Sequence, residues 1–127
     1  MGCHNIDPAM WALKLKYPST VEACSTQLSG ETTPLGTIVR FTFAAREGMP
    51  PVKLTWFDGG LFPPIPEEFK PGEKFDGNGI LFLGEKGKLL CGGWSRDPRL
   101  IPEGRMKEYR QPRPTLPRSK GHDRDWV

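Results

Sequence analysis

The sequence predicts an α+β protein: an open, mainly antiparallel β-sheet with a short N-terminal helix and an irregular, proline-rich, basic C-terminal arm. Three observations predict this class. Apolar and polar residues alternate with the period of a strand along several segments, 15 Gly and 14 Pro cut the chain into short pieces, and aromatic residues make up 10% of it. With 127 residues, the chain can form one domain whose core buries roughly two thirds of the unfolded surface.

The helix is expected near the N-terminus. Asp7 is a good N-cap, and Pro8 suits the first helical position because the amide that it lacks would have no partner there. We expect this helix to run to about Lys16. The pair Tyr17-Pro18 ends it, since the residue before a proline avoids the α conformation.

The strands follow from the alternation. Residues 20–27 alternate as in a half-buried strand, and residues 36–45 give the strongest strand signal of the chain. Residues 52–58 alternate again, and we expect them to pair with 36–45 as an antiparallel hairpin. Residues 79–84 and 88–93 form a second hairpin that is apolar on both faces, so that both of its faces require a cover.

Two segments lack a regular pattern. Residues 61–79 contain four prolines, which prevent a sheet ladder or a helix interior, and we expect a long surface loop there. We divide the chain into a sheet domain, residues 1–95, and an arm, residues 96–127. The arm holds nine basic and five acidic residues. Its prolines allow a short helical turn at 103–108, and its last segment is typical of the start of a longer helix. We therefore expect the chain to be part of a longer protein.

Several kinds of protein do not fit the sequence. No run of apolar residues approaches the roughly 18 that a membrane span needs, and the first residues lack the pattern of a signal peptide. The three cysteines, Cys3, Cys24 and Cys91, are far apart and indicate neither a disulfide scaffold nor a zinc site. We expect no membrane partner. A cytoplasmic location is the default, and a periplasmic one would require an export signal in a longer protein.

Four segments, in this order, resemble the C-terminal domain of the Gfo/Idh/MocA oxidoreductases, the family of glucose-fructose oxidoreductase and inositol dehydrogenase. The match covers nearly the whole chain and is closest to the bacterial branch of the family. The segments are Gly2-Cys3-His4-Asn5-Ile6-Asp7, Val52-Lys53-Leu54-Thr55-Trp56-Phe57-Asp58-Gly59-Gly60, residues 78–89, and Leu116-Pro117-Arg118-Ser119 with His122 and Trp126.

The resemblance implies a large open antiparallel sheet, covered by helices on one face and used for subunit contact on the other. It also implies a separate N-terminal Rossmann domain that binds NAD or NADP and an activity that oxidises a sugar or polyol. The chain has no Gly-x-Gly-x-x-Gly motif and lacks the Glu-Lys-Pro motif that carries the family's lysine. We therefore expect no cofactor site in this chain and no activity from it alone, with the Rossmann domain and further copies of the chain as partners.

His4 falls on the histidine that acts as acid and base in the family. An imidazole with a pKa near ~6.5 can accept the hydroxyl proton as hydride leaves the substrate. Two residues are candidates for binding the substrate. Trp56 can stack on a sugar or belong to the sheet core, and Asp58 can reach a hydroxyl group or cap a turn. We interpret Asp7 as the helix cap rather than as a catalytic group.

Two other functions stay open. The chain could be a freestanding interaction module that associates with itself through an exposed sheet face. It could also be a small basic module that binds nucleic acid. Against the second, no aromatic residues interleave with the basic ones of the arm and five acidic residues interrupt them, so we expect no nucleic-acid partner.

Overall fold

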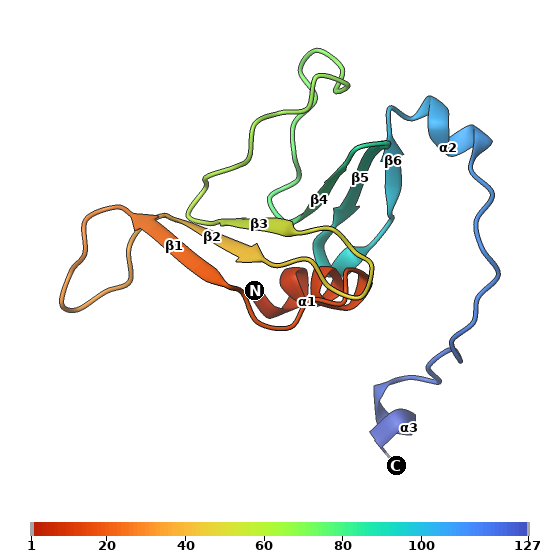
Figure 1. Cartoon of the computed structure of the whole chain (residues 1–127), viewed down its shortest axis with the longest axis horizontal. Coiled ribbons are helices and arrows are strands. Elements are labelled where there is room, and N and C mark those ends of the chain that lie inside the picture. Colours follow the sequence, from red (N-terminus) through yellow and green to blue (C-terminus); the bar gives the residue numbers. More distant parts are fainter. Residues whose placement is uncertain (1, 127) are drawn as a thin grey trace.

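The computed structural model describes residues 2–126 and has an α+β fold with six antiparallel strands. The predicted fold class is confirmed. The strands form two three-stranded sheets, β1-β2-β3 and β4-β5-β6, whereas the resemblance implies one large sheet. The long proline-rich loop after β3 accounts for the division, because it leads the chain away before β4 begins (Figure 1).

Helix α1 spans Gly2–Ala12, so the prediction that Asp7 caps the helix was wrong. Pro8 lies inside the helix, where its missing amide leaves the His4 carbonyl without a helical partner. Tertiary packing stabilises the part of the helix before Pro8, since α1 packs on β4 and on the 3₁₀ turn η1, Gly93–Ser95. Buried Asn5 belongs to this contact and donates a hydrogen bond to Asn78.

The end of α1 comes earlier than Tyr17. Lys14 adopts a left-handed conformation, with φ of 48°. The Lys14 amide donates to the Trp11 carbonyl at 3.2 Å and the Leu15 amide to the Met10 carbonyl at 2.8 Å, which is the Schellman pattern of a helix C-terminus. The Arg46 guanidinium also donates to the Leu13 and Lys14 carbonyls. These bonds tie the end of α1 to the loop between β2 and β3.

The first sheet consists of β1 (Thr20–Ser25), β2 (Thr37–Phe43) and β3 (Val52–Phe57). The predicted hairpin of β2 and β3 is confirmed, with Val39 opposite Trp56 and Phe41 opposite Leu54. Every residue of β1 is exposed, so the prediction of a half-buried strand was wrong there. Alternation in the sequence places apolar residues on one face, but it does not supply a cover for that face.

The second sheet consists of β4 (Gly79–Gly84), β5 (Gly87–Gly92) and β6 (Arg99–Ile101). The predicted hairpin of β4 and β5 is confirmed, and β6, which the sequence analysis missed, pairs with β5. The body of the protein therefore continues past residue 95, through β6 and α2 (Gly104–Glu108).

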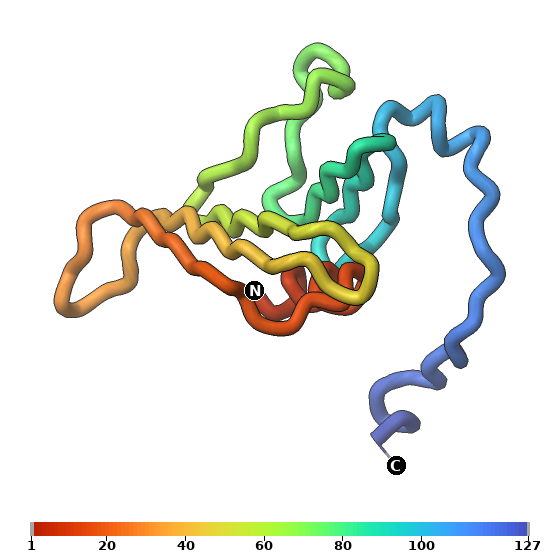
Figure 2. Tube along the Cα trace, viewed as in Figure 1, coloured from red at the N-terminus to blue at the C-terminus, as the bar shows by residue number. Residues whose placement is uncertain are grey.

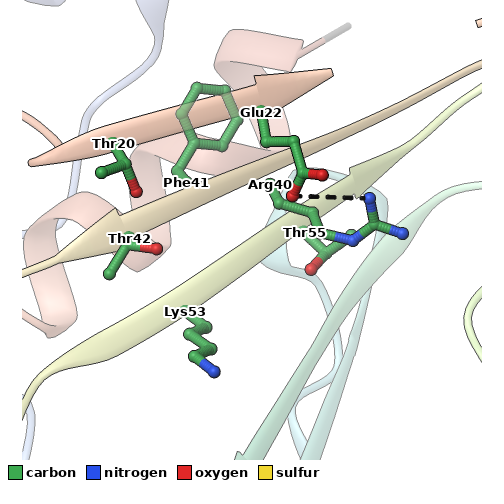
Figure 3. A pocket seen from close by; sticks show the side chains of 7 residues that line it. All are labelled: Thr20, Glu22, Arg40, Phe41, Thr42, Lys53 and Thr55. Atoms are coloured by element: carbon green, nitrogen blue, oxygen red, sulfur yellow. Dashed lines mark ion pairs between the residues drawn. The ribbon is translucent and has the colours of Figure 1, made fainter. Parts of the chain in front are cut away.

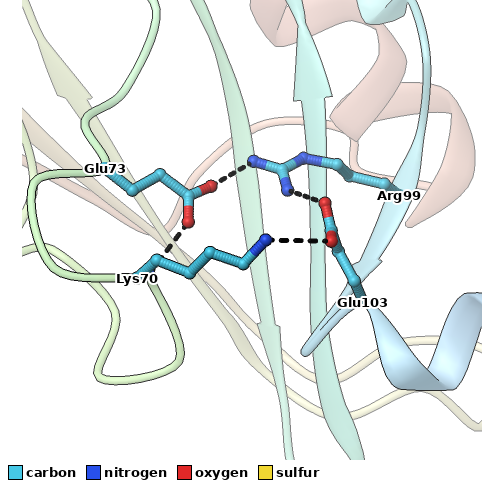
Figure 4. Close-up of polar contacts among 4 residues, drawn as sticks. All are labelled: Lys70, Glu73, Arg99 and Glu103. Atoms are coloured by element: carbon cyan, nitrogen blue, oxygen red, sulfur yellow. Dashed lines mark hydrogen bonds and ion pairs between the residues drawn. The ribbon is translucent and has the colours of Figure 1, made fainter.

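Ion pairs fasten the proline-rich loop to one face of the second sheet. Glu73 accepts from Arg99 at 2.9 Å, and Arg99 also reaches Glu103 at 3.3 Å, while Lys70 lies 3.6 Å from Glu103 (Figure 4). Lys88 of β5 adds a bond of 2.6 Å to Glu68. We call this set of ion pairs the loop clamp.

From residue 109 the chain is an extended arm that ends in α3 (His122–Trp126) (Figures 1 and 2). It runs away from both sheets, and all of its described residues are exposed. The well-buried residues of the body are few; those that the structure describes are Asn5, Ala9, Leu15, Gly36, Phe43, Pro66, Phe69, Cys91 and Ile101.

Candidate functional site

His4 of α1 lies beside Trp94 of the turn η1. The centroids of the two rings are 6.0 Å apart and the planes are tilted by 48°. His4 is exposed and Trp94 is 53% exposed, so a ligand can reach both rings from solvent. Helix α1 and the turn after β5 thus bring together two groups that are 90 residues apart in the sequence.

Arg96 completes this group on the solvent side. Its guanidinium lies 5.2 Å from the centroid of the Trp94 ring, a cation–π contact. Arg96 is exposed and forms no ion pair with a carboxylate among residues 2–126. We call His4, Trp94 and Arg96 the ring cluster.

The backbone that presents the ring cluster is strained. Trp94, Ser95 and Asp97 have φ of 58°, 57° and 47°, in the left-handed region that residues other than glycine rarely adopt. The Gly92 amide donates to the Arg96 carbonyl at 2.9 Å, which closes the turn. Such strain, at a cost of roughly 1–3 kcal/mol for each residue, concentrates at functional sites.

A small polar core supports the ring cluster from beneath. Asn5, only 4% exposed, donates from its side-chain amide to the side-chain oxygen Oδ1 of Asn78. Gly93 leaves room for this pair, because a Cβ at that position would lie 2.8 Å from the Asn78 amide nitrogen. Asn5 Oδ1 and Ser95 Oγ are buried without a partner among the described residues. Buried polar atoms of this kind are unusual in folded proteins and call for an explanation.

The three side chains of the ring cluster offer complementary chemistry for a polyhydroxylated ligand. An indole face stacks on the C–H face of a sugar, a guanidinium donates hydrogen bonds to hydroxyl oxygens, and an imidazole takes or gives a proton near neutral pH. The arrangement can therefore bind a sugar or polyol and place an acid/base group beside it.

Trp56 and Asp58 do not join the ring cluster. Asp58 accepts from the Thr37 amide at 2.7 Å and from the Trp56 indole nitrogen at 3.2 Å. These bonds, that from Trp56 first, hold the pKa of the Asp58 carboxyl below its usual value of 3.8. At about 3.3 Å per strand residue, Trp56 lies roughly 13 Å and Asp58 roughly 20 Å along the chain from the start of β3, where the loop that contacts α1 ends. In this structure Asp58 fastens the turn after β3 to the start of β2.

A shallow polar groove crosses one face of the first sheet, the face that carries Glu22, Arg40 and Thr55 (Figure 3). Its volume is about 180 Å³, and Glu22 and Arg40 form an ion pair of 3.9 Å across it. Neither His4, Trp56 nor Asp58 lines the groove. Its lining is Thr20, Glu22, Arg40, Phe41, Thr42, Lys53 and Thr55.

The described residues offer no group of three or more His, Cys, Asp or Glu side chains arranged to hold a metal ion. Cys3 and Cys24 are exposed free thiols, and burial raises the pKa of the Cys91 thiol. Among residues 2–126 no helix is both long enough and apolar enough to span a membrane.

The comparisons with known proteins add no relative. No protein-family model matches the chain, and no curated protein matches it. The resemblance to the Gfo/Idh/MocA oxidoreductases therefore remains a proposal.

His4 is a candidate from the sequence, whereas its neighbours Trp94, Arg96 and Asn78 emerge only from the structure. The signal for Trp94 is local: two glycines precede this tryptophan at the end of an apolar strand, where a turn exposes a large ring. No sequence pattern places Asn78 beneath Asn5, because that contact spans 73 positions of the chain.

Proposed function

We propose that this chain is the substrate-binding and oligomerisation part of an NAD(P)-dependent sugar or polyol oxidoreductase and is inactive alone. The observation that carries the proposal is the ring cluster, in which His4 lies beside an exposed indole, with an exposed guanidinium over the indole ring. It supports the role that the resemblance implies for His4, because the neighbouring groups suit a polyhydroxylated ligand.

The chemistry of the ring cluster follows from its side chains. Trp94 stacks on a C–H face of the sugar, and Arg96 donates to its hydroxyl oxygens. His4 accepts the proton of the hydroxyl group that becomes a carbonyl. NAD or NADP, bound by a Rossmann domain, supplies the acceptor for the hydride.

A calorimetric titration tests the proposal. Neutral polyols and sugars should bind the chain weakly, and Trp94→Ala should abolish the binding. NAD and NADP should not bind, because a Rossmann domain provides their site. Trp11→Ala is the matched control, since Trp11 is an exposed tryptophan of α1 outside the ring cluster. Polyol binding that survives Trp94→Ala, or dinucleotide binding to this chain, would contradict the proposal.

A second candidate function is self-association through the apolar face of the first sheet. Val21 of β1 lies on this face in register with Phe41 and Leu54, and it is 57% exposed. An apolar sheet face with an exposed edge favours pairing with another surface. Val21→Glu should weaken self-association, as measured by sedimentation equilibrium, and an unchanged association constant would exclude this face.

A further inference from the structure

The second sheet has an apolar row on the face opposite the loop clamp. Phe82 pairs with Leu89, and Leu89 pairs with Leu100, so that one apolar side chain from each strand lies on this face. These residues line a groove of about 290 Å³ and are only partly buried. The loop clamp engages Lys88 and Arg99, which alternate with this row and lie on the opposite face. Apolar side chains on a sheet face stabilise a protein when another element covers them, and this groove lies where that cover is incomplete.

The rim of the groove is basic. Lys86 and Arg105 line it, together with Lys88, whose ammonium group is bonded to Glu68 on the opposite face of the sheet. Arg105 lies over the turn between β4 and β5, where it donates to the Lys86 carbonyl above Gly87. The side chains of Lys86 and Arg105 form no ion pair with a described carboxylate. The groove therefore favours an occupant with an apolar anchor and acidic neighbours.

The arm has that composition at its end. Helix α3 contains Asp123, Asp125 and Trp126, with Arg124 between the two aspartates, and Trp126 is 91% exposed. The hydrogen bonds of this segment run only within residues 119–125. Every described residue from 102 onward is exposed.

The exposed area of the chain is large enough for an interface of ordinary size. Its accessible surface is 10699 Å², whereas a compact protein of 14.3 kDa exposes roughly 6,800 Å². The difference exceeds the roughly 1,600 Å² that a standard protein interface buries in total.

We propose that the arm of one copy of this chain docks on the second sheet of another copy. Trp126 fills the groove over Phe82, Leu89 and Leu100, and Asp123 faces Lys86 and Arg105. The arm starts directly after α2, whose Arg105 lines the groove of its own copy. From there the arm runs away from the second sheet (Figures 1 and 2). When two copies exchange their arms, no described contact between arm and body is lost, so the exchange is a low-cost route to a dimer. The proposal is independent of the sugar site and concerns another surface than the first sheet.

Sedimentation equilibrium of the full chain tests the arm exchange. The chain should be a dimer that dissociates on dilution, and Trp126→Ala should weaken the dimer roughly tenfold or more, as expected for a buried aromatic anchor. Trp11→Ala is the matched control. It should leave the dissociation constant of the dimer unchanged, because Trp11 is 75% exposed on α1 and does not line the groove. A monomer at all concentrations, or a dimer indifferent to Trp126→Ala, would overturn the proposal.

A charge exchange tests the orientation of the arm. Lys86→Glu should weaken the dimer about threefold to tenfold, and adding Asp123→Lys should restore it, because the pair is reversed rather than removed. Both side chains are exposed, so neither change disturbs the core. A double variant no tighter than the single one would contradict the proposed contact.

Mixed labelling distinguishes exchange from folding back. In a mixture of isotopically labelled and unlabelled copies, the Trp126 indole should give intermolecular contacts to Leu89 or Leu100. Contacts within one copy only would overturn the exchange while leaving the sugar site untouched.

Discussion

At the scale of single residues, Asp58 and Gly59 show how one turn is fixed. Asp58 accepts hydrogen bonds from Thr37 and Trp56, so its carboxylate joins the end of β3 to the start of β2. Gly59 follows with φ of 65°, and its Cα lies against the backbone of Leu35 and Gly36. The sequence allows Asp58 to be a substrate ligand or a turn cap, and these contacts give it the second role in this structure.

The two glycines of this turn provide a matched pair of variants. Gly59→Ala should destabilise the protein by about 3 kcal/mol or more, because the new Cβ overlaps the Leu35 carbonyl oxygen in addition to the left-handed strain. Gly60→Ala, with φ of 80° and open space around the Cβ, should cost only about 1 kcal/mol. Urea unfolding gives both free energies. Equal losses would show that the close approach to Leu35 is relieved at no cost.

Asn5 and Asn78 form the polar contact beneath the ring cluster. Asn78→Ala should destabilise the protein by about 1–3 kcal/mol, because it leaves the buried Asn5 amide without an acceptor. In a double-mutant cycle, Asn5→Ala and Asn78→Ala together should cost about 1 kcal/mol less than their sum. Additive losses measured in urea would mean that the two side chains are not coupled.

At the scale of elements, the loop clamp makes the proline-rich loop sensitive to acid. The bond from Lys88 holds the pKa of Glu68 below its usual 4.5, and the bond from Arg99 does the same for Glu73. Because both pKa values are lowered by folding, the stability from these groups is complete above pH 4.5. It is lost as the pH falls through the lowered pKa values.

Amide exchange in residues 61–78 measures this effect. Exchange should be slow at neutral pH and should accelerate as the pH falls below 4.5, after correction for the intrinsic rate. Glu73→Gln should accelerate it at pH 7, since it removes the charge that Arg99 contacts. Glu67→Gln is the control, because Glu67 is exposed and forms no ion pair in the described part of the chain. Equal exchange in the two variants would contradict the clamp.

The hairpins could be predicted because their strands are neighbours in the sequence, separated by short segments that contain glycine. The start of α1 could not be predicted, because the local preference of Pro8 for a first helical position yields to packing on β4 and η1. Strand β6 has only three residues beside two prolines, too short for a periodic pattern. The exposure of β1 depends on what covers a sheet face, and alternation carries no such information.

At the scale of the whole molecule, the described residues include few that are buried and leave a large area exposed, and this is the area that the proposed partners would cover. The high content of glycine and proline is consistent with this, because it favours loops and an extended arm over a thick core. The candidate site also depends on tertiary structure. His4 could be singled out from the sequence, but its neighbours Trp94 and Arg96 could not, since only tertiary structure brings α1 to the turn after β5.

The most direct test of the central claim, that the ring cluster binds a sugar or polyol, is a nuclear magnetic resonance titration of the full chain. The imidazole signals of His4 and the indole signal of Trp94 should shift together and saturate with one dissociation constant, while the Trp126 indole signal stays unchanged. Shifts confined to other residues, or the absence of any saturable shift with neutral sugars and polyols, would contradict the account.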